Sequence, residues 1–170
     1  MTMFHRAGSA MAFAGGLLLC SSAAMALETK PVVTLDLAKK MVAGCEAKAK
    51  QEGWKMNIAV VSDGANLIAF EHMDGAFLGS IYISQHKAMT SANFPFPTRR
   101  FAELAFGKDG KPGMVPGIAD VPGVIAFAGG LPIMTASKVQ IGGIGVSGGT
   151  SDQDEQCSQA GLDAVQDELK

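Results

Sequence analysis

The sequence predicts an α+β domain in which helices cover an antiparallel sheet, and three observations predict it. Two β-rich runs, 57–61 and 67–72, flank the turn sequence SDGAN, a pattern typical of a β-hairpin. Segments with helical periodicity stand before and after this hairpin. Further β-rich runs then precede a final helical segment, so the order is α-ββ-α-α-βββ-α. This order is typical of a mostly antiparallel sheet covered by helices.

The chain starts with the pattern of an export signal. His5 and Arg6 precede an almost wholly apolar run over 10–19, which is too short to span a bilayer as a mature anchor. The small-x-small sequence over 24–26 then predicts cleavage before Leu27.

We therefore expect a signal peptide over 1–26 and one mature domain over 27–170, in the periplasm or secreted. Cys20 is not expected to anchor the chain through a lipid, because bulky Leu19 stands where a lipobox has a small residue. The whole chain has 14 basic and 16 acidic residues. This balance argues against nucleic-acid binding and provides no polybasic patch for a membrane surface.

Two helical segments are bounded by residues that end helices. A helix is expected over 34–52, closed by Gly53, and the hairpin follows it. The next helix is expected over 77–92, because Pro95 and Pro97 end it.

The middle of the chain combines a short helix with an unusually long irregular stretch. Thr98 is expected to cap a helix over RRFAELAF. The stretch GKDGKPGMVPGIADVPG is rich in glycine and proline and is long for a loop in a compact domain. Its length indicates a functional loop or an oligomer contact.

The last part of the chain is expected to complete the sheet and add a helix. Strands are expected over 124–127 and 131–135, joined by a glycine pair, and over 139–146. The stretch TSDQDEQCSQAGLDAVQDEL is expected to be a helix capped by Thr150 or Ser151.

One glycine motif has the spacing of a dinucleotide site. Gly143-Ile-Gly145-Val-Ser-Gly148 fits G-x-G-x-x-G and stands between a predicted strand and a predicted helix. Acidic residues at the start of that helix complement its dipole and would repel a pyrophosphate. We expect the glycines instead to allow close packing of the strand and a turn into the helix. The sequence contains no H-E-x-x-H motif.

Two cysteines follow the predicted signal peptide, Cys45 and Cys157, and each lies in a helical segment. Their wide separation excludes a close-spaced zinc or redox motif. In an oxidising compartment they could form a disulfide between neighbouring helices. The alternative is two buried free thiols that act as small apolar side chains.

Two histidines, His72 and His86, follow the signal peptide. His72 ends the second strand of the hairpin, at the rim of the sheet. In the helix over 77–92, the apolar residues predicted to face the core are Phe77, Leu78, Ile81, Ala88, Met89 and Ala92. This stripe places His86 and Lys87 on the outer side of the helix. Each histidine could be a metal ligand or an ordinary structural or solvated residue.

Several segments together resemble the GlcG/HbpS family of haem-binding proteins. They are LIAFEHMDGA, GSIYISQHKAMTSANF with PTRRF, GGLPIM, and GGIGVSGGTSDQDEQCSQAGLDAV. The resemblance implies a profilin-like α-β-α sandwich with a five-stranded antiparallel sheet, related to the C-terminal domain of PduO-type adenosyltransferases. It also implies homo-oligomers from dimers to octamers, binding of haem or another tetrapyrrole, haem degradation in some members, and a sensor protein as partner.

The resemblance transfers onto particular positions. Met73-Asp74-Gly75 corresponds to the family's M-D-G, and Lys87 belongs to its K-A pair. The chain differs from the family at His72, where members often have arginine, and His86 occupies a variable position. We expect His72 to be the better haem-ligand candidate, because the sheet rim is accessible and a neutral imidazole can bind iron.

Two classes of function remain open. In a haem-binding protein, His72 or His86 would hold the iron, and Arg99 and Arg100, beside several phenylalanines, would meet the propionates. The alternative is a small enzyme or sensor that binds an organic acid near Asp74, Lys87 and the glycine- and proline-rich loop.

Overall fold

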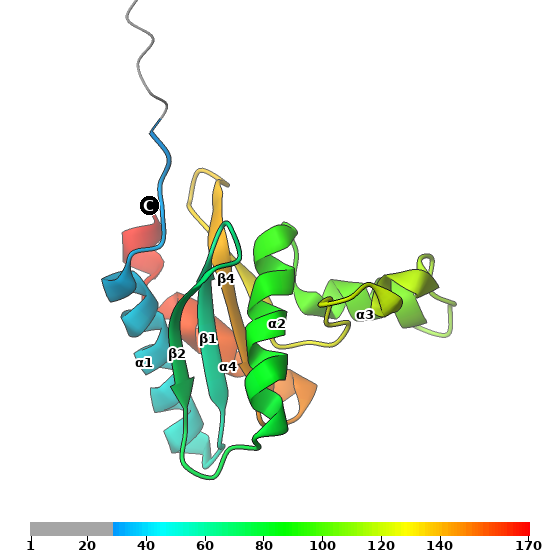
Figure 1. Cartoon of the computed structure of the whole chain (residues 1–170), viewed down its shortest axis with the longest axis horizontal. Helices are drawn as coiled ribbons and strands as arrows, with labels where there is room; N and C mark the ends of the chain where they lie inside the picture. The colour runs from blue at the N-terminus through cyan, green and yellow to red at the C-terminus, as the bar shows by residue number, and fades with distance from the viewer. Residues whose placement is uncertain (1–28) are drawn as a thin grey trace, which may run out of the picture.

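A four-stranded antiparallel sheet lies at the centre of the computed structural model, which describes residues 29–170. The strands are β1 (Asn57–Ser62), β2 (Leu67–His72), β3 (Gly130–Met134) and β4 (Gln140–Ser147), in the spatial order β2-β1-β4-β3. The helices are α1 (Leu35–Glu52), α2 (Gly79–Asn93), α3 (Thr98–Phe106) and α4 (Ser151–Asp163). Helices α1 and α4 cover one face of the sheet and α2 covers the other (Figure 1). The predicted signal peptide over 1–26 and Cys20 lie outside the described residues.

The first helix and the hairpin confirm the predictions from local sequence. The hydroxyl of Thr34 accepts a hydrogen bond from the backbone N–H of Leu37 and caps α1. Gly53 ends the helix with φ at 74°, a left-handed conformation that glycine adopts without a steric penalty. Strands β1 and β2 then pair antiparallel, with Asn57 opposite His72.

Helix α2 uses small residues, not large apolar ones, to face the sheet. It starts two residues later than predicted, and Phe77 and Leu78 just before it are 70% and 77% exposed. The buried residues of α2 are Ser80, Ser84, Lys87, Ala88, Thr90, Ser91 and Ala92. The predicted apolar stripe is therefore wrong at its first two positions, and Lys87 lies inside the protein.

The glycines of β4 explain why α2 has a small-residue face. A Cβ atom added to Gly143 or Gly145 would collide with the backbone of α2 around Ala88. The helix therefore lies directly against a strand without side chains at these positions. This confirms the interpretation of the glycine motif as a close-packing device.

The segment over 124–127 does not form the predicted fifth strand. The backbone N–H of Ile125 donates to the hydroxyl of Thr90 on α2, 3.1 Å away, and so binds a side chain in place of a neighbouring strand. At the edge of the sheet, β3 contains Pro132, which has no N–H for further pairing. The sheet therefore has four strands, not the five implied by the family resemblance.

Helix α3 and the loop after it project from the layered body (Figure 1). Thr98 does not cap α3, because Pro97 occupies the cap position. The Thr98 hydroxyl is buried and accepts a hydrogen bond from the N–H of Gly130, which fixes the base of the projection to β3. The loop contains a short 3-10 helix, η1 (Pro116–Asp120). We call α3 and residues 107–123 the projecting arm.

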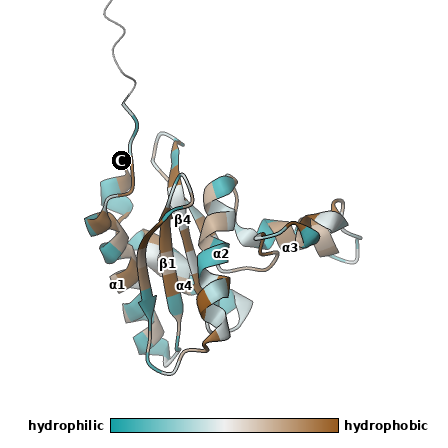
Figure 2. Cartoon of the chain, viewed as in Figure 1, coloured by the Kyte–Doolittle hydropathy of each residue, from teal (hydrophilic) through white to brown (hydrophobic). Residues whose placement is uncertain are grey.

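The main apolar core lies between the sheet and helices α1 and α4, and Figure 2 shows apolar residues along the strands and in α1. On the face covered by α1 and α4, Cys45 and Cys157 are joined by a disulfide, with 4.7 Å between their Cα atoms. Helix α4 begins at Thr150, one of the two predicted caps, whose side chain accepts from the backbone N–H of Gln153. Within residues 29–170, no helix is both long and apolar enough to cross a membrane.

Candidate functional site

His72 lies at the end of β2, where its imidazole is held in one orientation by Asn57. The amide nitrogen of Asn57 donates to the carbonyl of Phe77, 3.1 Å away, and to the hydroxyl of Ser80, 2.7 Å away. The amide oxygen therefore faces His72 Nδ1 at 2.6 Å and accepts its hydrogen. In the neutral ring, Nε2 is then left with a free lone pair, which is the state that can bind a metal.

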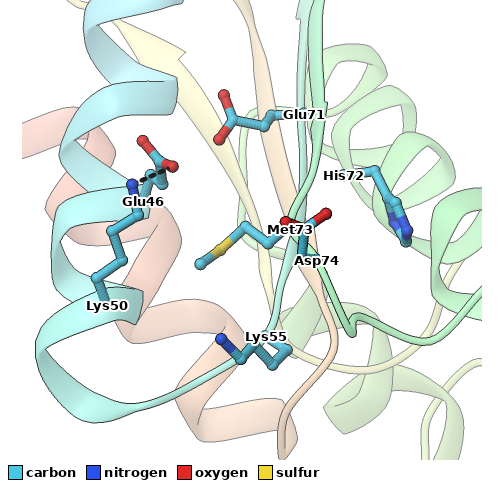
Figure 3. Close-up of a pocket in the computed structure, with 7 residues that line it drawn as sticks. All are labelled: Glu46, Lys50, Lys55, Glu71, His72, Met73 and Asp74. Carbon is cyan, nitrogen blue, oxygen red and sulfur yellow. Dashed lines mark ion pairs between the residues drawn. The ribbon is translucent and has the colours of Figure 1, made fainter.

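A hollow of about 380 Å³ lies at the end of β2 and is lined by Glu46, Lys50, Lys55, Glu71, His72, Met73 and Asp74. We call it the β2 hollow. Figure 3 shows Glu71 and Met73 directed toward α1, whereas the ring of His72 points the other way. Alternation of side chains along the strand explains this division. Met73, Asp74 and His72 line the β2 hollow, whereas Gly75 does not, and the ring of His72 points to the opposite side of the strand from Met73.

Charged groups dominate the β2 hollow. Glu46 and Lys50 form an ion pair with 2.6 Å between their charged atoms, and this pair lowers the pKa of Glu46. Burial raises the pKa of Glu71, and its contact with Glu46 raises it further. The hollow therefore combines three carboxylates with two ammonium groups, and Met73 is its one apolar member.

His86 is held from a different direction, by the loop over 121–124. The sequence Val-Pro-Gly-Val forms a tight turn there, with the N–H of Val124 bonded to the carbonyl of Val121 at 3.1 Å. Gly123 has φ at 83°, as the third position of a type II turn requires. Its carbonyl accepts a hydrogen bond from His86 Nδ1, 3.2 Å away. Nε2 of the neutral His86 ring is therefore also free to bind a metal.

A second hollow, of about 420 Å³, lies between α2 and this loop. We call it the α2 hollow; its lining residues are Ala65, His86, Met89, Thr90, Asn93, Phe94, Val121, Pro122, Gly123 and Val124. In contrast to the β2 hollow, it contains no charged side chain unless His86 is protonated. The ring of Tyr82 stacks on His86 with 3.9 Å between the ring centroids, which further restricts the imidazole.

The structure does not bring Lys87 to either hollow. Its side chain is fully buried and pairs with Asp154 of α4 at 2.7 Å. The organic-acid hypothesis required Lys87 to contact a ligand beside Asp74. The burial of Lys87 excludes that contact.

Arg99 and Arg100 are also engaged with carboxylates. Arg99 binds both Asp152 and Glu155 of α4, at 2.5 and 3.0 Å. Arg100 pairs with Glu103 one turn along α3, at 2.9 Å. Neither arginine lines the β2 hollow or the α2 hollow. A ligand that used these arginines would have to compete with the carboxylates for them.

The chain matches a protein-family model over most of its length. The family model described as "Haem degrading protein HbpS-like" matches residues 33–163. The chain belongs to the HbpS-like family. This confirms the resemblance found in the sequence motifs.

The HbpS-like chain is similar to proteins of known sequence and structure along most of its length. Protein GlcG of Escherichia coli (strain K12) is 31% identical over 121 residues, which cover 71% of this chain and 85% of GlcG. The crystal structure of HbpS is 32% identical with a TM-score of 0.72, covering 82% of this chain and 94% of HbpS. The structure of a PduOC:Heme complex shares the fold, with 20% identity, a TM-score of 0.69, and coverage of 79% and 96%.

Sequence reasoning missed the residues that orient the two imidazoles of this HbpS-like chain. Asn57 and Thr90 are buried polar residues inside regular elements, and their partners are 15 to 35 positions away in the sequence. The turn that presents Gly123 could have been found, because proline followed by glycine is typical of a type II turn. Within residues 29–170, no group of three or more His, Cys, Asp and Glu side chains is arranged to hold a bare metal ion.

Proposed function

We propose that this protein is an exported binding protein for haem or a related tetrapyrrole. Its family model is described as haem degrading. His72 and His86 each have the features of an iron ligand. The observation that carries the proposal is shared by His72 and His86. In both, Nδ1 is committed to an oxygen acceptor, so the neutral ring offers Nε2. Bound haem would supply the redox chemistry of its iron, which these side chains do not have.

The donor set fits a tetrapyrrole better than an organic acid. An imidazole with a fixed tautomer next to an apolar hollow is the combination that a flat, mostly apolar iron complex needs. An organic acid needs an unpaired cation, but Lys87, Arg99 and Arg100 each have a carboxylate partner. Lys55 forms no ion pair within the described residues, but it lines the β2 hollow together with the carboxylates of Glu46, Glu71 and Asp74, which disfavour an anion there. These pairings remove the main support for the organic-acid alternative.

Haem titration of the mature protein tests the proposal. The wild-type protein is expected to give a saturable, shifted Soret band, and the double variant His72→Ala/His86→Ala to lose the spectrum of an imidazole-ligated iron. A double variant at exposed positions, Lys138→Ala/Asp163→Ala, controls for unspecific effects and should bind as the wild type does. Absence of a saturable Soret band in the wild-type protein would overturn haem binding. An unchanged band and affinity in the double histidine variant would overturn ligation by histidine.

Export is tested separately, on protein recovered from the periplasm. Intact-mass measurement is expected to give a chain that starts at Leu27 and carries no lipid on Cys20. A chain that retains residues 1–26, or a lipid on Cys20, would contradict export by signal-peptide cleavage.

Assembly into homo-oligomers, from dimers to octamers, and contact with a sensor protein belong to the same proposal. The projecting arm supports it, because Phe106 and Met114 on the arm are 69% and 84% exposed. Light scattering after size-exclusion chromatography would give the mass in solution. A monomer at micromolar concentration would contradict the assembly part of the proposal.

A further inference from the structure

We infer that the α2 hollow receives the tetrapyrrole and that His86, not His72, is its iron ligand. This inference rests on the proposed function and assigns it a place in the fold. It reverses the preference drawn from the sequence, where His72 at the sheet rim was the better candidate. The reversal follows from what surrounds each imidazole.

The two hollows differ in the polarity of their lining, which determines how well each can hold the apolar ring of a porphyrin. Five of the seven residues around the β2 hollow are charged, so a macrocycle placed there would remove water from carboxylates and ammonium groups. The α2 hollow offers Met89, Phe94, Val121, Pro122 and Val124. Its volume of about 420 Å³ falls within the usual range for ligand sites, roughly 300 to 1,000 Å³.

The His86 ring is held as metal-binding imidazoles usually are. A metal-bound histidine commonly donates its other ring N–H to a backbone carbonyl or a carboxylate, which fixes the tautomer and the ring orientation. Gly123 supplies that carbonyl for His86. Tyr82 stacks against the same ring and restricts its rotation. Within residues 29–170, His72 has the side-chain amide of Asn57 as its one hydrogen-bond partner.

Thr90 acts as a positioning residue for this site. Its hydroxyl donates to the carbonyl of Gly123 at 3.3 Å and accepts from the N–H of Ile125 at 3.1 Å. It therefore fixes the loop at both sides of Val124, and with it the carbonyl that orients His86. Thr90 is buried, and besides holding this loop it forms part of the wall of the α2 hollow.

Single variants separate the two histidines. His86→Ala is expected to abolish the imidazole-ligated haem spectrum and to weaken haem binding at least about ten-fold, whereas His72→Ala changes affinity by less than about two-fold. Added imidazole should restore the ligated spectrum of His86→Ala by occupying the vacated position. Thr90→Val retains His86 and should weaken haem binding by roughly ten-fold, within the range measured for residues that hydrogen-bond to metal ligands. Thermal unfolding of each apo-protein identifies variants that do not fold.

If His86→Ala does not fold, a measurement that leaves His86 and the α2 hollow unchanged still tests the inference. With 15N-labelled histidine in the His72→Gln variant, ferric haem should broaden or strongly shift the His86 ring resonances, while zinc protoporphyrin should perturb the same signals without paramagnetic broadening. The inference is overturned if wild-type protein binds haem but His72→Ala, and not His86→Ala, loses the ligated spectrum. It is also overturned if the His86 resonances do not respond to bound haem. If wild-type protein binds no haem at all, the proposed function fails first.

Discussion

The ammonium of Lys87 lies 2.7 Å from the carboxylate of Asp154, and both side chains are buried, at 0% and 3% exposure. Lys87 also donates to the carbonyl of Val146 at 3.0 Å and lies 4.6 Å from the centre of the Phe127 ring. The second oxygen of Asp154 accepts from the N–H of Gly149 at 2.9 Å. Burial lowers the pKa of Lys87 and raises that of Asp154, while their mutual attraction opposes both changes. The pair connects α2, the end of β4 and the first turn of α4.

Lys87→Met is expected to destabilise the protein by about 3–5 kcal/mol at neutral pH, because it leaves the Asp154 carboxylate buried without its partner. Urea unfolding followed by circular dichroism measures the change. The double variant Lys87→Met/Asp154→Leu should recover part of the loss, since no buried charge remains. Lys108→Met, which removes a solvent-exposed pair with Glu103, is the control and should change stability little. A loss for Lys87→Met no larger than in this control would contradict the role of the pair.

The Lys87–Asp154 pair also shows where sequence-based prediction ends for this protein. Helix periodicity treats lysine as an outer residue, and only its partner 67 positions away makes its burial possible. The glycines of β4 similarly allow small residues of α2, rather than its large apolar ones, to face the sheet. These are pairings between distant segments, which no local pattern contains.

Local signals predicted the elements well where a cap or a turn determined them. Thr34, Gly53 and Thr150 bound their helices as expected. The hairpin formed because its turn sequence and its β-rich runs agree. The strand expected from the β propensity of residues 124–127 does not form, and the N–H of Ile125 donates to Thr90 instead, a contact that no local pattern contains. For the candidate site, sequence identified both histidines but not the surroundings that distinguish them.

Glu71→Gln is expected to stabilise the protein at neutral pH. Burial and the neighbouring Glu46 raise the pKa of Glu71 in the folded state, so its ionised form is disfavoured there. This cost is present above the folded pKa and disappears below the unfolded value near 4.5, where both states are protonated. Glutamine resembles the protonated acid and lacks the cost at every pH.

The measurement for Glu71→Gln is the free energy of unfolding as a function of pH. Its advantage over the wild type should be present at pH 7 and vanish as the pH falls below the usual carboxyl range. Glu103→Gln is the control, because Lys108 and Arg100 lower the pKa of Glu103 and its loss should not stabilise the protein. A wild-type curve parallel to that of Glu71→Gln throughout would show that the pKa of Glu71 is not raised.

Removal of the disulfide is expected to lower stability substantially. Cys45 and Cys157 are 112 positions apart, and in the chain-entropy model closing so long a loop stabilises the fold by at most about 4–5 kcal/mol. The variant Cys45→Ala/Cys157→Ala should therefore unfold at lower urea concentration than the oxidised wild type. Reducing agent should shift the wild-type curve and leave that of the double variant unchanged. Peptide mapping without reduction that finds both thiols free in exported protein would contradict the bond.

Gly145→Ala tests the close packing between β4 and α2, on which the position of His86 depends. A methyl group at this position would collide with the backbone N–H of Ala88 and the carbonyl of Ser84, and neither can move without displacing the helix. Overpacking of this kind costs roughly 1–3 kcal/mol and can cost more when backbone must shift. Thermal unfolding should therefore show a lower midpoint for Gly145→Ala. Gly79→Ala is the matched control, because a Cβ atom there meets no other atom within 4 Å and should leave the midpoint unchanged or raise it slightly. Equal midpoints for the two variants would mean that α2 can move away from the strand without cost.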